Sequence, residues 1–245
     1  MFDDQKSRLL AALDALHSEY SQAEESDWPS LYFHLRSLEA ARAKNFQQFA
    51  ECAYAMLVSW QMNSNNAKMR PFDEFRSSLR LIWTKALQLQ EKTPDTLGGW
   101  DWSSLKEVFW RIRCMKSGTS LVGNSKVMAH LIPSLIPPVD RRYTISFLFG
   151  SGDFTNGLEP EWKMLEQMLR NFFYPIAQSE AFQARAREWL SSSNPFRWDT
   201  SPLKLVDNLT MQLFRCHKCG KSNSFSSPIT YHSDTNEYLC SKCAS

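Results

Sequence analysis

The chain has 245 residues, of which 43% are hydrophobic and 22% charged, and its formal net charge at pH 7 is +2. This composition excludes a disordered chain and fits one folded domain, or one domain with a small appendage. The N-terminus lacks the basic start of a signal peptide, and no segment approaches the roughly 20 apolar residues of a membrane-spanning helix. We therefore expect an intracellular, cytoplasmic protein that has no membrane partner and acts as a monomer.

Apolar residues recur at helical spacing along most of the chain, so the sequence predicts an all-α fold. Residues 45–60, for example, place Phe46, Phe49, Ala53 and Leu57 on one stripe. The predicted helices are 5–22, 45–60, 72–90, one capped by Asp101 and ended near Gly118, 159–174, 178–190 and 202–214. No alternating strand is evident before residue 220, and we expect one helical body over residues 1–214.

A turn is also predicted within residues 119–126. Gly123 and Asn124 are the two residue types that most readily adopt positive φ, so a tight hairpin is predicted there. Ser125 would cap the next helix, which would begin at Lys126 and end where three prolines follow. The predicted layout is therefore a helix, a hairpin and a second helix.

Asp140 is the single acidic residue of the apolar segment 121–144 and follows Pro137, Pro138 and Val139. The prolines place it where another helix would begin, and that helix is predicted to run to about Gly150. An aspartate in this position ordinarily caps the helix.

Two Cys-x-x-Cys pairs, Cys216 with Cys219 and Cys240 with Cys243, lie near the C-terminus. Four thiolates at such spacing are typical of a tetrahedral structural zinc site, which leaves no open position for catalysis. The alternative is a pair of disulfides, which an intracellular chain disfavours. We predict a zinc module over residues 215–245, with a β-hairpin or ribbon between the pairs.

The order of these features resembles the helix-hairpin-helix superfamily of DNA glycosylases. The matching residues are Leu121-Val122-Gly123-Asn124-Ser125-Lys126, then Val139-Asp140, and earlier Val58-Ser59-Trp60-Gln61-Met62-Asn63. In that family a hairpin precedes a lysine-bearing helix and a catalytic aspartate, and a Leu-Ser-x-Gln stretch ends an early helix. This chain differs by having Asn124 in place of a second hairpin glycine and by a shorter lysine-to-aspartate spacing. Better-known members hold an iron–sulfur cluster where the cysteine spacing here favours zinc.

The resemblance implies an enzyme that flips a damaged or modified base out of double-stranded DNA and excises it, leaving an abasic site. Some bacterial members of this kind attack modified bases in phage DNA. Asp140 would be the catalytic carboxylate, stabilising positive charge on the sugar or activating water. Lys126 would either attack the sugar or supply positive charge only, and a monofunctional enzyme is favoured over a lyase.

The resemblance also implies a set of residues that contact DNA, through the base stack or through phosphates. These candidates are Gln61, Asn63, Gly123, Asn124, Ser125, Arg141 and Arg142. Trp60 and Tyr143 are weaker candidates for the base pocket, because aromatic residues are more often part of the core. A non-catalytic DNA-binding or adaptor protein of a defence or stress system remains the alternative function, and a protein-interaction module is a third.

Overall fold

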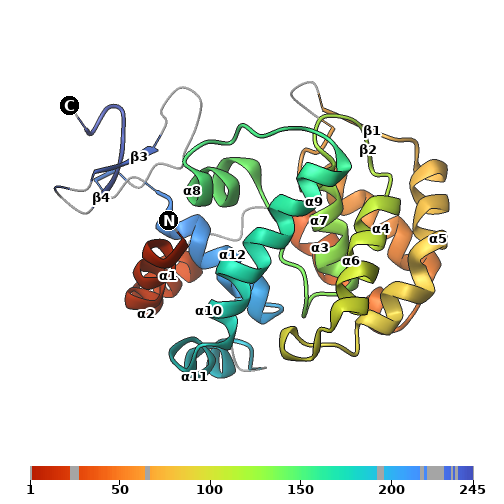
Figure 1. The fold of residues 1–245 in the computed structure, drawn as a ribbon, viewed down its shortest axis with the longest axis horizontal. Helices are drawn as coiled ribbons and strands as arrows, with labels where there is room; N and C mark the ends of the chain where they lie inside the picture. The colour runs from red at the N-terminus through yellow and green to blue at the C-terminus, as the bar shows by residue number, and fades with distance from the viewer. Residues whose placement is uncertain are drawn as a thin grey trace.

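The computed structural model describes residues 2–22, 28–63, 67–191, 196–215, 218–219, 229–232, 234 and 237–244. Over these residues the fold is mostly helical (Figure 1). The α-helices are α1 (Phe2–Ala11), α2 (Leu13–Gln22), α3 (Trp28–Arg42), α4 (Phe46–Ser59), α5 (Phe72–Leu89), α6 (Gly99–Arg111), α7 (Ser120–Leu131), α8 (Ser146–Phe149), α9 (Leu158–Met168), α10 (Tyr174–Gln178), α11 (Glu180–Trp189) and α12 (Pro202–Leu213). The other elements are the 3-10 turn η1 (Pro94–Thr96), the π-helical turns η2 (Arg141–Ile145) and η3 (Leu169–Phe173), and the strands β1 (Lys68–Met69), β2 (Met115–Ser117), β3 (Ile229–His232) and β4 (Glu237–Cys240). Among the described helices, none combines the length and apolar character needed to cross a membrane.

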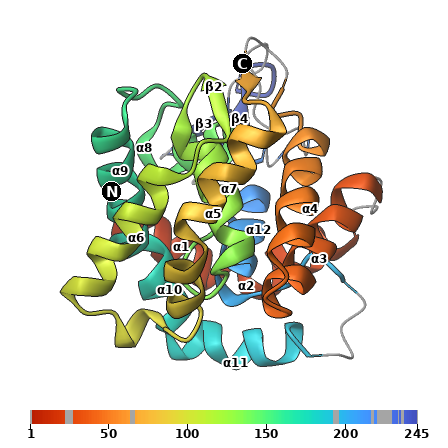
Figure 2. The same cartoon turned by 90° about the vertical axis from the view of Figure 1, so that its right-hand side faces the viewer.

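The helices form two groups, one around α7 and one around α12. Helix α7 packs against α3, α4, α6 and α9, whereas α12 packs against α1, α2 and α10 (Figure 1). Helices from the start of the chain thus lie beside a helix from near its end. Figure 2 shows α11 at one end of the molecule and strands β2, β3 and β4 at the opposite end. The arrangement brings residues that are far apart in the sequence to the boundary between the two groups.

Four sequence-predicted helices are confirmed closely. They are 45–60, 72–90, 178–190 and 202–214, which match α4, α5, α11 and α12 to within two residues. The first three each bury one apolar stripe, whereas α12 is buried on most of its surface, polar residues included. In α5 the stripe consists of Phe75, Leu79, Ile82, Ala86 and Leu89, all at most 1% exposed.

Helix α3 was not predicted, although it packs against α4. Its buried face combines Leu31 and Leu38 with the polar residues Ser30, His34 and Ser37. These polar side chains interrupt the apolar stripe, so periodicity alone does not reveal the helix.

Other predicted boundaries were wrong where the chain bends. The predicted helix 5–22 is divided into α1 and α2 at Ala12, and the predicted helix 159–174 continues through η3 and α10 as far as Gln178. The helix predicted to reach Gly118 ends at Arg111, and β2 follows it and pairs antiparallel with β1. The expectation of no strand before residue 220 was therefore wrong, since strands of two and three residues are too short to show alternation.

The predicted hairpin at 119–126 is also wrong. Thr119 caps α7, which begins at Ser120, so Gly123, Asn124 and Ser125 lie inside the helix. The backbone takes positive φ instead at Gly118, where φ is 88°. Gly123 serves close packing, because a Cβ atom there would lie 2.5 Å from the Sγ of Cys114.

The C-terminal strands form the ribbon expected between the two cysteine pairs. Strand β3 pairs antiparallel with β4, and Ile229 lies opposite Cys240. Tyr238 packs against Phe147 of α8 and Phe214 at the end of α12, with ring centroids 5.9 and 5.4 Å apart. Its hydroxyl oxygen lies 3.1 Å from the Nη1 of Arg8, which donates to it. The ribbon is therefore attached to the helical body through α1, α8 and α12.

Candidate functional site

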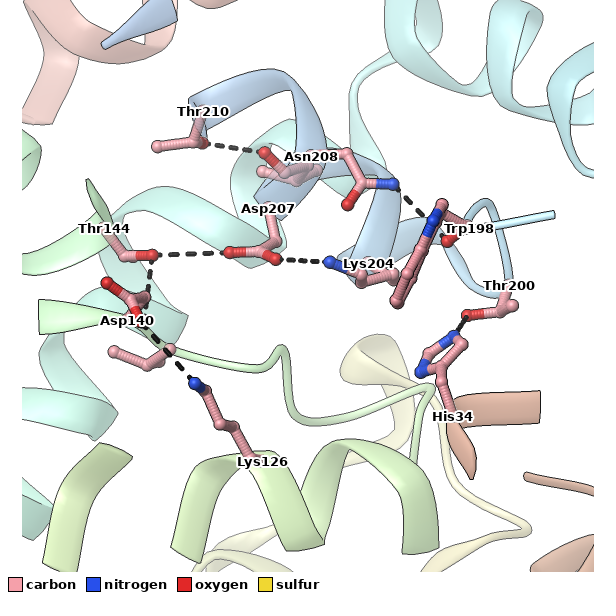
Figure 3. Close-up of polar contacts among 12 residues, drawn as sticks. His34, Lys126, Asp140, Thr144, Trp198, Thr200, Lys204, Asp207, Asn208 and Thr210 are labelled. Atoms are coloured by element: carbon pink, nitrogen blue, oxygen red, sulfur yellow. Dashed lines mark hydrogen bonds and ion pairs between the residues drawn. The ribbon is translucent and has the colours of Figure 1, made fainter. Parts of the chain in front are cut away.

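Lys126 and Asp140 meet at the boundary between the two groups of helices (Figure 3). The Nζ atom of Lys126 lies 3.6 Å from the Oδ2 atom of Asp140. The lysine side chain is 9% exposed and that of the aspartate 32%. The pair thus joins a buried cation to a carboxylate that solvent can reach.

The backbone around Asp140 fixes one of its two carboxylate oxygens. Oδ1 accepts hydrogen bonds from the N–H groups of Arg142, at 2.8 Å, and Tyr143, at 3.4 Å. Asp140 is therefore the N-cap of η2, which is the ordinary role of an aspartate at this position. The cap leaves Oδ2 to face Lys126.

The Lys126 ammonium is held between an aromatic ring and a thioether. It lies 5.0 Å from the ring centre of Trp60 and 3.8 Å from the Sδ of Met62. Trp60 is half-buried, and its ring also packs 5.5 Å from that of His130. Of the two base-pocket candidates, the structure brings Trp60 to the Lys126–Asp140 pair, whereas Tyr143 contributes its backbone N–H to the cap of Asp140.

Gly123, Asn124 and Ser125 are buried inside α7, and the polar side chains among them bind other parts of the protein. The Asn124 amide donates to the carbonyl oxygens of Phe109, at 2.8 Å, and Ile112, at 3.2 Å, which closes the end of α6. Ser125 accepts a hydrogen bond from the N–H of the residue before Asp140, at 3.1 Å. These residues therefore position α7 and the Asp140 segment.

The N-terminus of α7 is likewise occupied by the protein itself. The N–H of Leu121 donates to a carboxylate oxygen of Glu161, which is 2% exposed. The Glu161 carboxylate therefore lies at the positive end of the α7 dipole, where an acid is stabilised.

The remaining predicted DNA contacts lie on the surface. Gln61 is exposed and adopts a φ of 56°, and the Oδ1 of Asn63 accepts from the N–H of Met69 at 3.2 Å. Arg141 and Arg142 are exposed beside Asp140, and the Arg141 guanidinium lies 4.9 Å from the ring centre of a phenylalanine. The structure thus leaves these four residues at or near the surface.

A second carboxylate, Asp207 of α12, lies behind Asp140 and was missed by sequence reasoning. Its Oδ2 lies 2.8 Å from the Nζ of Lys204, and its Oδ1 lies 3.3 Å from the Oγ1 of Thr144. Burial raises the pKa of Asp207, and the neighbouring Asp140 adds to this, while the Lys204 ammonium opposes it. A lysine and an aspartate three positions apart in a helix ordinarily form a surface pair, so the sequence gives little signal of this burial.

His34 and His130 form a buried pair next to Trp60. The Nδ1 of His34 lies 2.7 Å from the Nε2 of His130. The Nε2 of His34 contacts the hydroxyl of Thr200, and the Nδ1 of His130 contacts the carbonyl oxygen of Lys126. Burial lowers the pKa of His34 well below its ordinary value and that of His130 to about 4. His130 also lines a cavity of about 690 Å³, whose described lining residues include neither Lys126 nor Asp140.

Three of the four predicted metal ligands come together. Ligand atoms of Cys219, Cys240 and Cys243 all lie within 4.8 Å of one another, and Cys216 lies outside the described residues. The Sγ atoms of Cys219 and Cys240 are 3.7 Å apart, too far for a disulfide. Sulfur atoms on one edge of a tetrahedron with metal–sulfur distances of about 2.3 Å would lie roughly 3.8 Å apart. The geometry therefore fits a metal site.

The chain was compared with models of protein families, with curated proteins and with solved structures, and none of the three comparisons gives a match.

Proposed function

We propose that this chain is a DNA glycosylase that flips out a damaged or modified base and cleaves its N-glycosidic bond, with Asp140 as the catalytic carboxylate. The observation that carries the proposal is the Lys126–Asp140 pair. One oxygen of Asp140 is bound by backbone N–H groups, and the other lies 3.6 Å from a buried ammonium. This fixes the direction of a carboxylate that remains partly exposed.

Cleavage of an N-glycosidic bond develops positive charge on the deoxyribose, as in other glycoside cleavages. A carboxylate held beside the sugar stabilises that charge or accepts a proton from the attacking water. Oδ2 of Asp140 suits either role, because Oδ1 accepts the capping hydrogen bonds and cannot turn toward the substrate without breaking them. The leaving base carries the electron pair of the broken bond, and water supplies the new sugar hydroxyl.

Lys126 is assigned a supporting role in a monofunctional enzyme. Its ammonium contacts Asp140, Trp60 and Met62, so it lies under the carboxylate and not beside open solvent. From there it orients Oδ2 by charge. A nucleophilic lysine would have to leave these contacts to reach the sugar.

DNA would approach from the side on which Asp140 is exposed. Arg141 and Arg142 flank the aspartate, and the β1–β2 sheet next to the Gln61 and Asn63 turn carries the exposed cations Lys68 and Lys116. Exposed cations bind phosphates and make affinity depend on salt. Gln61 and Asn63 would then contact the gap left by the flipped base.

The cysteine cluster is proposed to hold a structural zinc ion through Cys216, Cys219, Cys240 and Cys243. Such an ion would supply folding free energy to a module with little core of its own. The ribbon contains Cys240, with Cys243 just after it, and packs on α8, the helix that follows η2. The metal would thus act by bracing the fold.

A non-catalytic DNA-binding or adaptor protein is the second candidate. Two observations favour it. The carboxylate of Glu161 binds the N-terminus of α7, and Asp140 caps η2. A protein that only binds DNA could have both features.

One experiment separates the two candidates. Purified protein is incubated with duplexes that carry damaged bases or hypermodified phage-type cytosines, and abasic sites are scored by alkaline strand cleavage. DNA affinity is measured on the same duplexes at several salt concentrations. The glycosylase proposal expects abasic sites in at least one duplex and none in the unmodified control. Salt-dependent binding with no abasic site in any duplex would favour the binding protein.

A further inference from the structure

We propose that Asp207 is a positioning residue for Asp140 and acts through the hydroxyl of Thr144. This inference rests on the proposed function, because it assigns Asp207 a part in the same site. Thr144 lies in η2, Asp140 is the N-cap of η2, and Asp207 lies in α12 (Figure 3). The proposed contacts therefore link the Asp140 segment to α12.

The direction of the hydrogen bonds follows from the donors alone. The backbone N–H of Asp140 can only donate, and it lies 3.3 Å from the Oγ1 of Thr144, which accepts. The single hydroxyl hydrogen of Thr144 is then directed to the Oδ1 of Asp207, also at 3.3 Å. Asp207 therefore orients the hydroxyl that holds the Asp140 backbone.

Burial makes this chain of hydrogen bonds specific. Thr144 is fully buried, and Asp207 is 2% exposed, so neither side chain can exchange its partner for bulk water. An unpaired polar group in such a place is costly, which keeps the arrangement in one state. Lys204, 7% exposed, holds the other oxygen of Asp207.

The consequence for the site lies in the orientation of one atom. The Asp140 carboxylate is fixed through Oδ1 by the N–H groups that follow it, and its backbone is fixed through its own N–H by Thr144. Together these contacts determine where Oδ2 lies relative to Lys126. Loss of the Thr144 acceptor would allow the cap residue to shift, and a shift of about 1 Å can reduce a rate by roughly 100-fold.

The first test does not depend on any substrate. Hydrogen exchange of the Asp140 backbone N–H is followed by NMR in the full chain, in Thr144→Val and in Thr144→Ser. Valine keeps the shape without the hydroxyl, whereas serine keeps the hydroxyl. We expect exchange to be roughly five- to tenfold faster in the valine variant and near wild type in the serine variant. Equal protection in all three proteins would overturn the proposal.

The second test isolates Asp207 without leaving a buried charge unpaired. In Lys204→Met/Asp207→Asn the asparagine can still accept from Thr144, whereas in Lys204→Met/Asp207→Leu it cannot. On a duplex from which wild type releases a base, the leucine protein is expected to lose roughly 10- to 100-fold in kcat with KM little changed. The asparagine protein is expected to stay within about threefold of wild type. Equal loss in both would overturn the role of the acceptor.

The two tests also separate this inference from the proposed function. If wild type releases no base from any duplex, the glycosylase proposal fails while the exchange measurement still decides whether Thr144 holds the Asp140 backbone. If wild type releases a base and Thr144→Val matches it in both exchange and kcat, the glycosylase proposal stands and the positioning role fails.

Discussion

Lys126 of α7 and Asp140 at the start of η2 approach each other to 3.6 Å, between Nζ and Oδ2, although the proline-containing segment separates them in the chain. The approach is made possible by Ser125, which binds the N–H of Val139 and so holds the returning chain against α7. The lysine lies beneath the carboxylate on the Trp60 ring. This relationship gives the first prediction.

Replacement of Lys126 by methionine should remove the charge and keep the contact with Trp60 and Met62. We expect base release to fall by roughly 100-fold, since removal of one charge-stabilising group in an active site costs about that much. Affinity for unmodified DNA should change by less than about twofold. Single-turnover rates and binding isotherms check both values.

The same lysine allows a check on the reaction class. Borohydride added during turnover should trap no covalent complex with DNA, because Lys126 is assigned an orienting role. A trapped complex that disappears in Lys126→Met would instead identify the lysine as a nucleophile and the protein as a lyase.

Gly123→Ala should destabilise the fold by roughly 1–3 kcal/mol, because the new Cβ atom would meet the Sγ of Cys114 inside a closely packed region. The matched control is Gly99→Ala, where nothing lies within 4 Å of the added atom and the expected change is below about 1 kcal/mol. Urea unfolding followed by circular dichroism gives both values. Equal stability of the two variants would contradict the packing role of Gly123.

The sequence predicted those parts of the fold in which one apolar stripe faces the core. Helix α5 was predicted almost to the residue for this reason. The Gly123-Asn124 pair led to the wrong prediction of a turn. Glycine is needed at position 123 because Cys114 packs against it in the tertiary structure, which the local sequence does not show. Residue type indicated a turn, and packing determined a helix.

The candidate site was predictable in part, for a similar reason. The resemblance pointed to Lys126 and Asp140, and the structure brings them together. Asp207 could not be found, because Lys204 and Asp207 have the spacing of an ordinary surface ion pair and only the packing of α12 buries both. Burial of a polar pair is a property of the whole fold and has no local signature.

The free energy of unfolding should decrease as the pH is lowered below about 6.5, because the buried histidine pair resists protonation in the folded state. Burial lowers the pKa of His34 and His130, to about 4 for His130, and the cations Lys204, Arg42 and Lys126 add to this. The unfolded chain therefore takes up protons first, so stability is fully present above the unfolded value and is lost as pH falls toward 4. Each histidine contributes up to about 1.4 kcal/mol per pH unit.

Urea unfolding at pH 7, 6 and 5 measures this slope. In His130→Asn the contribution of one histidine disappears, so the dependence of unfolding free energy on pH should be flatter than in wild type. An unchanged slope would show that other groups cause the dependence.

Removal of the metal should loosen the C-terminal ribbon. Cys240→Ser should reduce the bound zinc, measured by mass spectrometry of the metal, from about one equivalent to much less, and should lower Tm by roughly 5 °C or more. Cys52→Ser is the control, because Cys52 lies outside the three-cysteine cluster. Equal metal content in both variants would contradict the assignment of the ligands.

The central claim is that Asp140 performs the chemistry, and the single-turnover rate of base release by Asp140→Asn tests it most directly. The asparagine can keep the cap through its Oδ1 while losing the charge, and Asp153→Asn makes the same change at an exposed position nearby in the sequence. We predict a loss of roughly 100- to 10,000-fold for Asp140→Asn, with DNA affinity retained, and a wild-type rate for Asp153→Asn. Base release by Asp140→Asn at the wild-type rate would contradict the account.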